Sequence, residues 1–586
     1  MQEKRILPRR RGGVLLCVLG CLFVFFVKTE KDLAAAGNIL WTAGYVGRTL
    51  LWTVLMGCLL GVIGTFVVYR AAERPAPEGA GKDNTGKGDA VFCRSAVWIQ
   101  NRSGAQVFFG SLLLLCLAWL PVYLAYYPGI CAYDAPVQTG QIVEHYYFDH
   151  HPIVHTLLLQ GMLWLGTQLF GSMNAGMALY TALQMLLLAG SMSYGVLVLH
   201  RRQVAAGWQI VMLLEMFFPF HWYMSVSMTK DTVFSAFLLL QLISLTDLLL
   251  EDRREWRPGV RDLLFFIGTV GMILFRNNGK YAMIVLLAFL FLAVCFGKRA
   301  RKLWGRLFTV SVAAFCIGLF VLSAVFSATH AEQGDRREML SMPIQQMARC
   351  MIYHGGVGVL PEDDGTMSEQ DRALVNDFIL DEAYRDYDPD IADPVKRHTN
   401  TYVVRYRSGD FLRTYFHLLK SYPGDMINAA LAVDAGFLSP FDVTHATVNE
   451  VQGREGLGYI QTRWEEDTLN NRGIYKDSKW PGLYDRLETW ADGNGYLELP
   501  VLKYLFVPGS YLWLYLALAA ILVIVDRKRY CLSLAVIAGY YGTMLLGPTV
   551  QMRYVYPVML ALPYLVALMC GTDRKTENEK TETEIG

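Results

Sequence analysis

Charged residues are scarce in this chain. Asp, Glu, Lys and Arg make up 18% of its 586 residues, the formal net charge is +1, and 53% of the residues are hydrophobic. A nucleic-acid-binding domain normally has a large basic excess, so this balance argues against such a partner. The sequence also lacks CxxC pairs, zinc-type cysteine spacing and an HExxH pattern. No standard zinc motif is therefore present.

Long apolar stretches separated by short charged loops dominate the sequence, and this pattern is typical of a helical membrane protein. The predicted fold class is mainly α, a polytopic membrane protein with about twelve transmembrane helices. The predicted spans are Val14–Val27, Leu50–Tyr69, Val107–Tyr126, Ala175–Leu199, Ala205–Phe220, Thr232–Leu250, Leu263–Phe275, Tyr281–Phe296, Phe308–Val325, Leu502–Val525, Leu532–Leu546 and Tyr556–Cys570.

The charges of the loops predict the orientation of these spans. Residues 71–105 are rich in Pro, Gly, Lys and Asp and carry several cations, so we expect a disordered cytoplasmic linker. The next span then runs outward, and Asp134 emerges on the extracytoplasmic face. Counting Pro152–Phe170 as a span would put His200 and the two following arginines outside. We therefore expect this segment to be a helix that lies in the outer interface or is re-entrant.

These assignments divide the chain into six parts. We expect membrane spans at 1–70, the linker at 71–105, a transmembrane core at 106–329 with its first external loop at 127–172, an extracytoplasmic soluble domain at 330–500, closing spans at 501–570 and a cytoplasmic tail at 571–586. Residues 330–500 have soluble composition, and amphipathic stretches in them indicate mostly helix. The predicted location is the cell membrane, multi-pass, with the active site on the extracytoplasmic face.

The loop at 126–155 is acidic and rich in His, and it contains no Lys or Arg. Asp134, Gln138 and Gln141 have i, i+4 and i+7 spacing, which would place a carboxylate and two amides on one face of a short helix. Such a loop is either an ordinary solvated connection or a functional site. We take the second interpretation, with Asp134 as the catalytic residue.

Four cations on the predicted outer face oppose the usual insertion bias, and each stands beside the end of a span. They are Lys230, Arg276, Lys280 and Arg553. Singly, each could be an anchor that reaches the lipid headgroups. Together, beside an acidic loop, they indicate a site for an anion at the membrane surface. Asp231 could instead pair with Lys230 or cap its helix, and Arg553 with Tyr554 could form an interfacial anchor.

Possible metal ligands also occur in the acidic loop. Asp149, His150 and His151 are residue types that bind divalent metals, and His151 shares a helix face with His155. No diagnostic spacing accompanies them. The cofactor requirement therefore stays open, with a divalent metal as one option.

Several motifs together resemble a known superfamily. They are YDAPVQ and HHPIVHTLL after an early span, SMTKDTVFSAF, FRNNGKYA and QMRYVYPVMLALPY. This set resembles the GT-C superfamily of integral-membrane glycosyltransferases, and more narrowly an uncharacterised bacterial multi-span family with that fold, over residues 106–570. The resemblance implies that Asp134 is the catalytic carboxylate of the first external loop. It also implies that Lys230, Asp231, Arg276 and Arg553 border the donor site.

We add Lys280, Tyr554, His151 and Gln138 as candidate substrate-binding residues. One departure from the family pattern concerns the acidic pair that many relatives have in the first loop. Here Glu144 and Asp149 are only loosely spaced candidates for its second member. Metal dependence is therefore not predicted in either direction.

The expected function is a GT-C-type, inverting glycosyltransferase. It would move a sugar from a polyprenyl-phosphate donor to an extracytoplasmic glycan, lipid or protein. A phosphate leaving group is already a stable anion, so it needs cations, and one carboxylate suffices as general base. The alternatives are a flippase or transporter of lipid-linked saccharides and a polymerase or ligase of surface polysaccharide. The lack of similarity between the two halves of the chain argues against the transporter.

Overall fold

The computed structural model describes residues 2–73, 99–132, 134–250, 259–297, 301–442 and 469–571. Within these residues the chain is mainly α-helical, and strand-like pairing is limited to isolated bridges such as that of Ile130 with Ser227. Most of the predicted linker and nearly all of the predicted tail lie outside the described residues.

The chain up to residue 330 forms mostly long helices. They are α1 (Gln2–Ala36), α2 (Ala43–Glu73), α4 (Gly104–Ala125), α5 (Ala135–Glu144), α6 (Ile153–Phe170), α7 (Met173–Arg201), α8 (Ala206–Glu215), α9 (Pro219–Val226), α10 (Lys230–Leu249), α11 (Val260–Phe275), α12 (Asn277–Phe296) and α13 (Arg301–Ala328).

Short helices follow before the chain returns to longer ones. They are α14 (Ser341–His354), α15 (Glu369–Asn376), α16 (Glu382–Arg385), α17 (Asp393–Arg397), α18 (Thr401–Tyr406), α19 (Ser408–Ser421), α20 (Pro423–Val433), α21 (Ala435–Leu438) and α23 (Pro481–Asp492). The last three are α24 (Pro508–Ile524), α25 (Cys531–Met544) and α26 (Met552–Cys570).

Nine helices of the described residues are long and apolar enough to cross a membrane, namely α1, α2, α4, α6, α7, α10, α12, α13 and α26. The multi-span helical prediction is confirmed, but the count of about twelve is not reached. Helices α11, α24 and α25 have only 16, 17 and 14 residues. By length and composition α6 also qualifies as a span. Its expected position in the outer interface therefore stays a prediction.

The predicted span Ala205–Phe220 is wrong as a single helix. The chain forms α8 and α9 there, separated near Phe217. Pro219 begins α9, where its missing N–H costs nothing, whereas inside a continuous helix it would remove a hydrogen bond and clash with the preceding turn. Apolar composition identified the segment, and one proline divides it.

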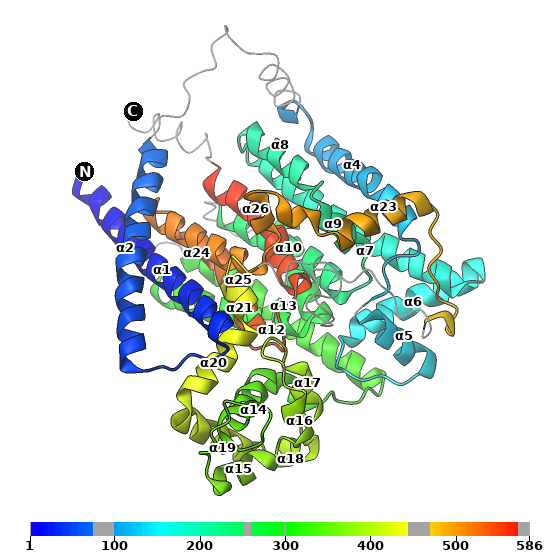
Figure 1. Ribbon diagram of the computed structural model, residues 1–586. Helices are drawn as coiled ribbons and strands as arrows, with labels where there is room; N and C mark the ends of the chain where they lie inside the picture. Colours follow the sequence, from blue (N-terminus) through cyan, green and yellow to red (C-terminus); the bar gives the residue numbers. More distant parts are fainter. Residues whose placement is uncertain are drawn as a thin grey trace.

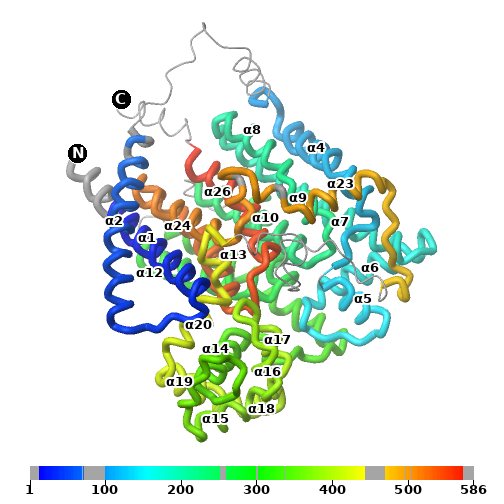
Figure 2. Tube along the Cα trace, in the orientation of Figure 1, coloured from blue at the N-terminus to red at the C-terminus, as the bar shows by residue number. Residues whose placement is uncertain are grey.

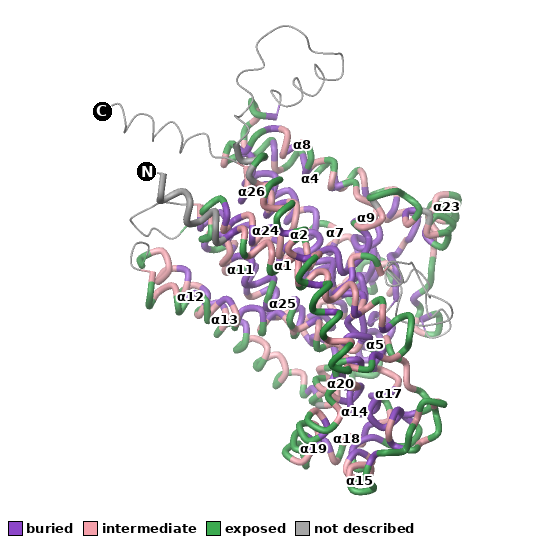
Figure 3. Tube along the Cα trace, turned by 60° about the vertical axis from the view of Figure 1, so that its left-hand side comes forward, coloured by how far each residue is buried: buried purple, intermediate pink, exposed green. Residues whose placement is uncertain are grey.

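Helix α10 lies at the centre of the membrane helices, packed against α7, α11 and α26 (Figure 1). Within its apolar window, 89% of the residues are buried in the protein, compared with 28% for α12 and 17% for α13. Helices α12 and α13 run along an edge of the molecule with largely intermediate or exposed residues (Figure 3). The protein core is therefore built around α10, and α12 and α13 are peripheral.

Helices α14 to α20 gather at one end of the molecule, at the bottom of Figure 1. Met347, Phe378 and Phe411 belong to their shared apolar cluster. The predicted domain at 330–500 extends further than this region, because its described residues 469–500 pack elsewhere. Helix α23 packs on α4 instead, and its Leu487 carbonyl accepts a hydrogen bond from Tyr223 of α9 (Figure 2). The α23 residue Leu487 packs against the main membrane core. Amphipathic composition alone does not predict which part of the protein such a helix will pack against.

Loops from distant parts of the membrane region meet the α14–α20 region. Trp41 Nε1 donates a hydrogen bond to Asn428 Oδ1 (2.8 Å), and Ala392 N donates to Pro548 O (2.7 Å). The loop after α5 joins the chain that leads into this region, because Asp149 N donates to Glu332 O (3.1 Å). These loops therefore share one end of the membrane helices. That this end is extracytoplasmic stays a prediction.

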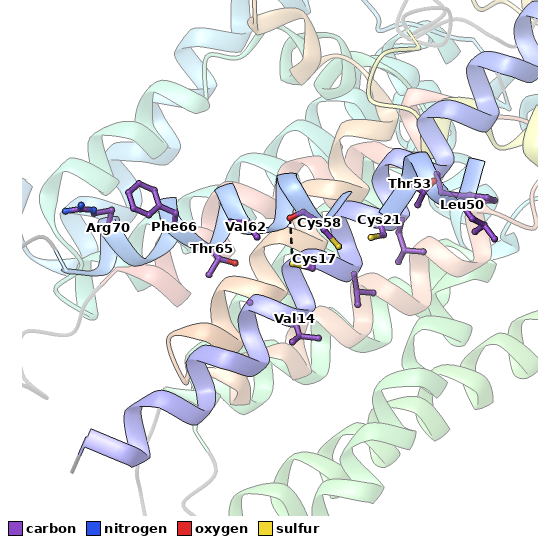
Figure 4. Close-up of a pocket in the computed structure, with 14 residues that line it drawn as sticks. Val14, Cys17, Cys21, Leu50, Thr53, Cys58, Val62, Thr65, Phe66 and Arg70 are labelled. Carbon is purple, nitrogen blue, oxygen red and sulfur yellow. Dashed lines mark hydrogen bonds between the residues drawn. The ribbon is translucent and has the colours of Figure 1, made fainter. Parts of the chain in front are cut away.

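Residues of α1 and α2 line a groove of about 1210 Å³ (Figure 4). Its walls are mostly apolar, with Arg70 at one end. The two helices touch beside it, since a side chain at Gly57 or Gly61 would collide with the α1 backbone. None of the candidate site residues lines this groove. It belongs to the α1–α2 hairpin and not to the site.

Candidate functional site: a buried ion cluster

Asp134 precedes α5, and its carboxylate turns into the protein. It occupies the N-cap position, but its side chain makes no capping hydrogen bond. The carboxylate pairs instead with the ammonium of Lys230 and lies 3.5 Å from Arg553 Nη1 and 3.8 Å from His151 Nδ1. Asp134 is 9% exposed. The predicted catalytic carboxylate is thus almost enclosed by groups that arrive from other elements.

A second carboxylate, that of Asp231, completes the cluster. It is fully buried, pairs with Arg276 and lies 3.7 Å from Arg553 Nη1. Arg553 therefore lies between the two carboxylates and links Asp134 to Asp231. The sequence predicted these residues as neighbours of one site, and the structure brings them together.

The local fold explains why these groups meet. Lys230 and Asp231 open α10, whose N-cap Thr229 accepts a hydrogen bond from Asp231 N (3.3 Å). Arg276 stands in extended backbone between α11 and α12, and Arg553 is the second residue of α26. The N-terminal ends of α5, α10, α12 and α26 thus converge on the cluster. Helix N-termini carry partial positive charge and favour anions.

Aromatic rings hold the Arg276 guanidinium. Its centre lies 4.7 Å from the ring centre of Tyr554 and 5.8 Å from that of Tyr540. Arg276 is 7% exposed, and its buried Nε has no hydrogen-bond acceptor among the described residues. Cation–π contacts fix the plane of the guanidinium but do not satisfy its donors. One donor in the cluster is therefore available to an oxygen ligand.

The charges of the cluster do not balance. Burial opposes ionisation of Asp134, but Lys230 and Arg553 hold its pKa well below the usual range. Burial lowers the pKa of His151 to about 3, so this imidazole is neutral at physiological pH. By formal charge, Lys230, Arg276 and Arg553 outnumber Asp134 and Asp231 by one. An excess cation in a nearly enclosed site favours an anionic ligand.

Gln138 hydrogen-bonds to residues outside the ion cluster, and within the described ranges its side chain does not pair with the charged groups of the cluster. Its Oε1 lies 3.0 Å from His155 Nδ1, and its Nε2 donates to Thr156 Oγ1 (2.9 Å). The other ring nitrogen of His155 lies 2.5 Å from the Tyr180 hydroxyl. This buried network ties α5 to α6 and α7. The predicted substrate-binding role of Gln138 has no direct support in this geometry.

Lys280, Asp149 and His150 contact groups outside the ion cluster. Lys280 lines a separate cavity together with Asp149. Asp149 accepts a hydrogen bond from Gly334 N, and His150 lies 4.0 Å from Glu338.

In the described part of the chain no three His, Cys, Asp or Glu side chains are grouped to hold a metal ion. The proposed ligands His150, His151 and Asp149 have separate partners.

The sequence did not predict a role for Arg472, which hydrogen-bonds to the first turn of α5. Its Nη1 donates to Pro136 O (2.7 Å) and to Thr139 Oγ1 (3.2 Å), and its guanidinium covers Gly140. Leu469 from the same segment packs in a cluster with Cys131 and Ala135 beside Asp134. Residues 469–472 therefore hold α5, the helix that follows Asp134, in place through these contacts. No local pattern in the sequence connects positions so far apart.

A model of a family of unknown function, DUF6020, matches residues 142–584 of the chain. The chain belongs to this family. The DUF6020 match includes Lys230, Asp231, Arg276 and Arg553, and it begins after Asp134. No curated protein and no solved structure matches the chain. Membership in DUF6020 agrees with the expected uncharacterised multi-span family.

Proposed function

We propose that this DUF6020 protein is a membrane glycosyltransferase. It moves a sugar from a polyprenyl-phosphate donor to an extracytoplasmic acceptor, which is a cell-surface glycan, a lipid or a protein. One observation supports this proposal above the others. Asp134 pairs with Lys230 and Arg553 in a buried cluster, and Asp231 links Arg553 to Arg276 in the same cluster.

The cluster has the properties that a phosphate requires. It has one excess positive charge, and the N-terminal ends of four helices converge on it. A phosphate oxygen would accept a hydrogen bond from Arg276 Nε, for which the described residues supply no acceptor. Hydrogen bonds between guanidinium and phosphate are strong because both partners are charged.

The proposed reaction is a single displacement. The hydroxyl oxygen of the acceptor attacks the anomeric carbon of the sugar, and the bond between that carbon and the phosphate oxygen breaks. The electron pair of this bond stays on the phosphate, which the cluster's cations stabilise. Asp134 accepts the hydroxyl proton as general base. Attack opposite to the leaving phosphate inverts the anomeric configuration.

The ion pairs of Asp134 link donor binding to base strength. Lys230 and Arg553 keep the pKa of Asp134 low, and a carboxylate held in this way is a weak base. A bound phosphate would compete for the same two cations and weaken their hold on Asp134. The carboxylate would then become a better base only when the donor is present.

The test uses purified protein in proteoliposomes with a polyprenyl-phosphate hexose labelled in the sugar. A glycan and lipid extract from cells that lack the protein serves as acceptor. Asp134→Asn removes the base while keeping the size of the side chain, so transfer of label should fall on the order of a thousandfold. The matched control is Asp381→Asn, an exposed residue of the α14–α20 region, which should retain wild-type transfer.

Two results would contradict the proposal. One is full transfer by a folded Asp134→Asn variant. The other is movement of the labelled lipid across the bilayer by the wild-type protein without a new glycosidic bond, which would identify a flippase. A product that carries a whole transferred glycan, obtained only when the donor is an oligosaccharide, would identify a polymerase or ligase.

A further inference from the structure

A cavity of about 250 Å³ lies beside the ion cluster, between α6, α12 and α13. Lys280 and Asp149 contribute charged side chains to its lining, and Ile153 and Phe326 contribute apolar walls. The cavity shares backbone with the cluster. Its lining residue Asn277 follows Arg276 directly, and its lining residue Pro152 follows His151. A ligand in this cavity is therefore next to the proposed site.

Lys280 differs from the cations of the cluster in its partners. Lys230 pairs with Asp134, and Arg276 pairs with Asp231. In the part of the chain that the structure describes, no carboxylate lies within ion-pair distance of the Lys280 ammonium, which is 5.2 Å from the ring centre of Tyr281. Asp149 lines the same cavity, but its Oδ1 accepts the Gly334 N–H. The ammonium of Lys280 is thus available to an external anion.

The helices around the cavity are candidate membrane spans in which most residues are not buried in the protein. Within the apolar windows of α6, α12 and α13, only 33%, 28% and 17% of the residues are buried in the protein. Figure 3 shows α12 and α13 along one edge of the molecule. A lipid can therefore reach the cavity sideways while its apolar chain stays in the membrane. Its polar group then meets Lys280.

We infer that this cavity is the lateral access site for a polyprenyl chain that carries a single phosphate, with Lys280 as the residue that first binds the phosphate. A cavity of about 250 Å³ holds a headgroup but not a long lipid chain, which stays between the bilayer-facing helices. The phosphate then moves past Asn277 to Arg276 and Arg553. The choice of polyprenyl phosphate over another lipid phosphate rests on the proposed function.

The test measures lipid binding to the purified full chain in detergent by native mass spectrometry. The probes are polyprenyl monophosphate, polyprenol without phosphate, and phosphatidylglycerol. We expect the wild-type protein to prefer polyprenyl monophosphate to polyprenol at least tenfold. Lys280→Gln should weaken binding of the phosphate lipid about tenfold or more, because a charge-assisted hydrogen bond is lost. Lys280→Arg should restore it.

Two further variants separate a specific site from a general charge effect. Val154→Trp fills the cavity from α6 and should weaken binding as Lys280→Gln does. Lys302→Gln removes an exposed cation at the other end of α13 and should change nothing. Unchanged binding to Lys280→Gln and Val154→Trp would overturn the inference. Phosphatidylglycerol binding that equals polyprenyl monophosphate binding would also overturn it, since the site would then accept any anionic lipid.

The same variants distinguish this inference from the proposed transferase activity. If binding depends on Lys280 but wild-type protein transfers no sugar, the access site stands and the transferase proposal fails. If Lys280→Gln transfers sugar as fast as wild type at limiting donor concentration, the access site fails and the transferase proposal stands.

Discussion

Replacement of Arg276 by Gln tests whether the cluster is held together as the structure describes. Asp231 is fully buried and pairs with Arg276. Removing one member of a buried ion pair typically costs about 3–5 kcal/mol, because the remaining charge has lost its partner. Arg553 still lies 3.7 Å from Asp231, and the Thr229 hydroxyl still donates to it at 3.1 Å. The expected loss for Arg276→Gln is therefore near the lower limit, about 3 kcal/mol.

The assay should measure the free energy of unfolding, not only a melting temperature. Scaling by chain length predicts a shift in Tm of only about 1 °C per kcal/mol for 586 residues, which is small. Unfolding in mixed micelles with an increasing SDS fraction, followed by tryptophan fluorescence, is the better measurement. The control Arg407→Gln breaks exposed ion pairs with Asp377 and Asp410, which water screens, so its loss of stability should be far smaller than that of Arg276→Gln.

A double-mutant cycle completes the test. Asp231→Asn combined with Arg276→Gln removes both charges, so the double variant should be more stable than the sum of the two single losses predicts, by about 1–3 kcal/mol. A loss for Arg276→Gln as small as that for Arg407→Gln would refute the reasoning. Additive single losses would also refute it, because Asp231 would then not depend on Arg276.

Two further predictions follow from the groups around Asp134. The pKa of His151 is about 3 in the folded protein and about 6.5 when unfolded, so the unfolded state binds the extra proton as pH falls from 6.5 towards 3. Stability should therefore fall by about 1.5 kcal/mol between pH 6.5 and pH 5, and His151→Gln should lose this dependence. Arg472→Ala should raise the rate of amide hydrogen exchange in residues 135–144 about tenfold, because α5 loses the charged donor to its first turn. The control Arg486→Ala changes an exposed residue of α23 and should leave this rate unchanged.

The sequence predicted most of the cluster because membrane topology restricts where a span end can lie. Lys230, Arg276 and Arg553 each stand beside a span end on the same predicted face, so their convergence required only that these spans be neighbours. Lys280 stands one helical turn beyond Arg276 on α12 and lines the neighbouring cavity instead. Spacing along the chain could not distinguish the two positions, since both are polar residues at the start of one helix.

Other features depended on tertiary contacts that have no local signal. Gln138 was expected on the same face as Asp134, but α5 begins at Ala135, and Asp134 lies before the first helical residue. The Asp134 carboxylate pairs with Lys230, whereas the Gln138 amide bonds to Thr156 and His155, and spacing along the chain does not specify these partners. Residues 469–500 were assigned to the soluble domain because their composition is soluble. Leu469 packs beside Asp134 instead, and α23 packs on α4 and contacts α9.

The two carboxylates of the cluster have different surroundings, and these surroundings assign them different roles. Asp231 is fully buried at the start of α10, the most buried candidate span, and its partner Arg276 is held by aromatic rings. Neutralising it should weaken the fold. Asp134 retains some exposure, and the short helix that follows it is held through Gln138 and Arg472, not through the carboxylate. Its ionisation contributes little to the placement of α5. Under the proposed function, the Asp134 carboxylate would give up Lys230 and Arg553 to a bound phosphate, whereas Asp231 would keep Arg276 and Arg553 in place.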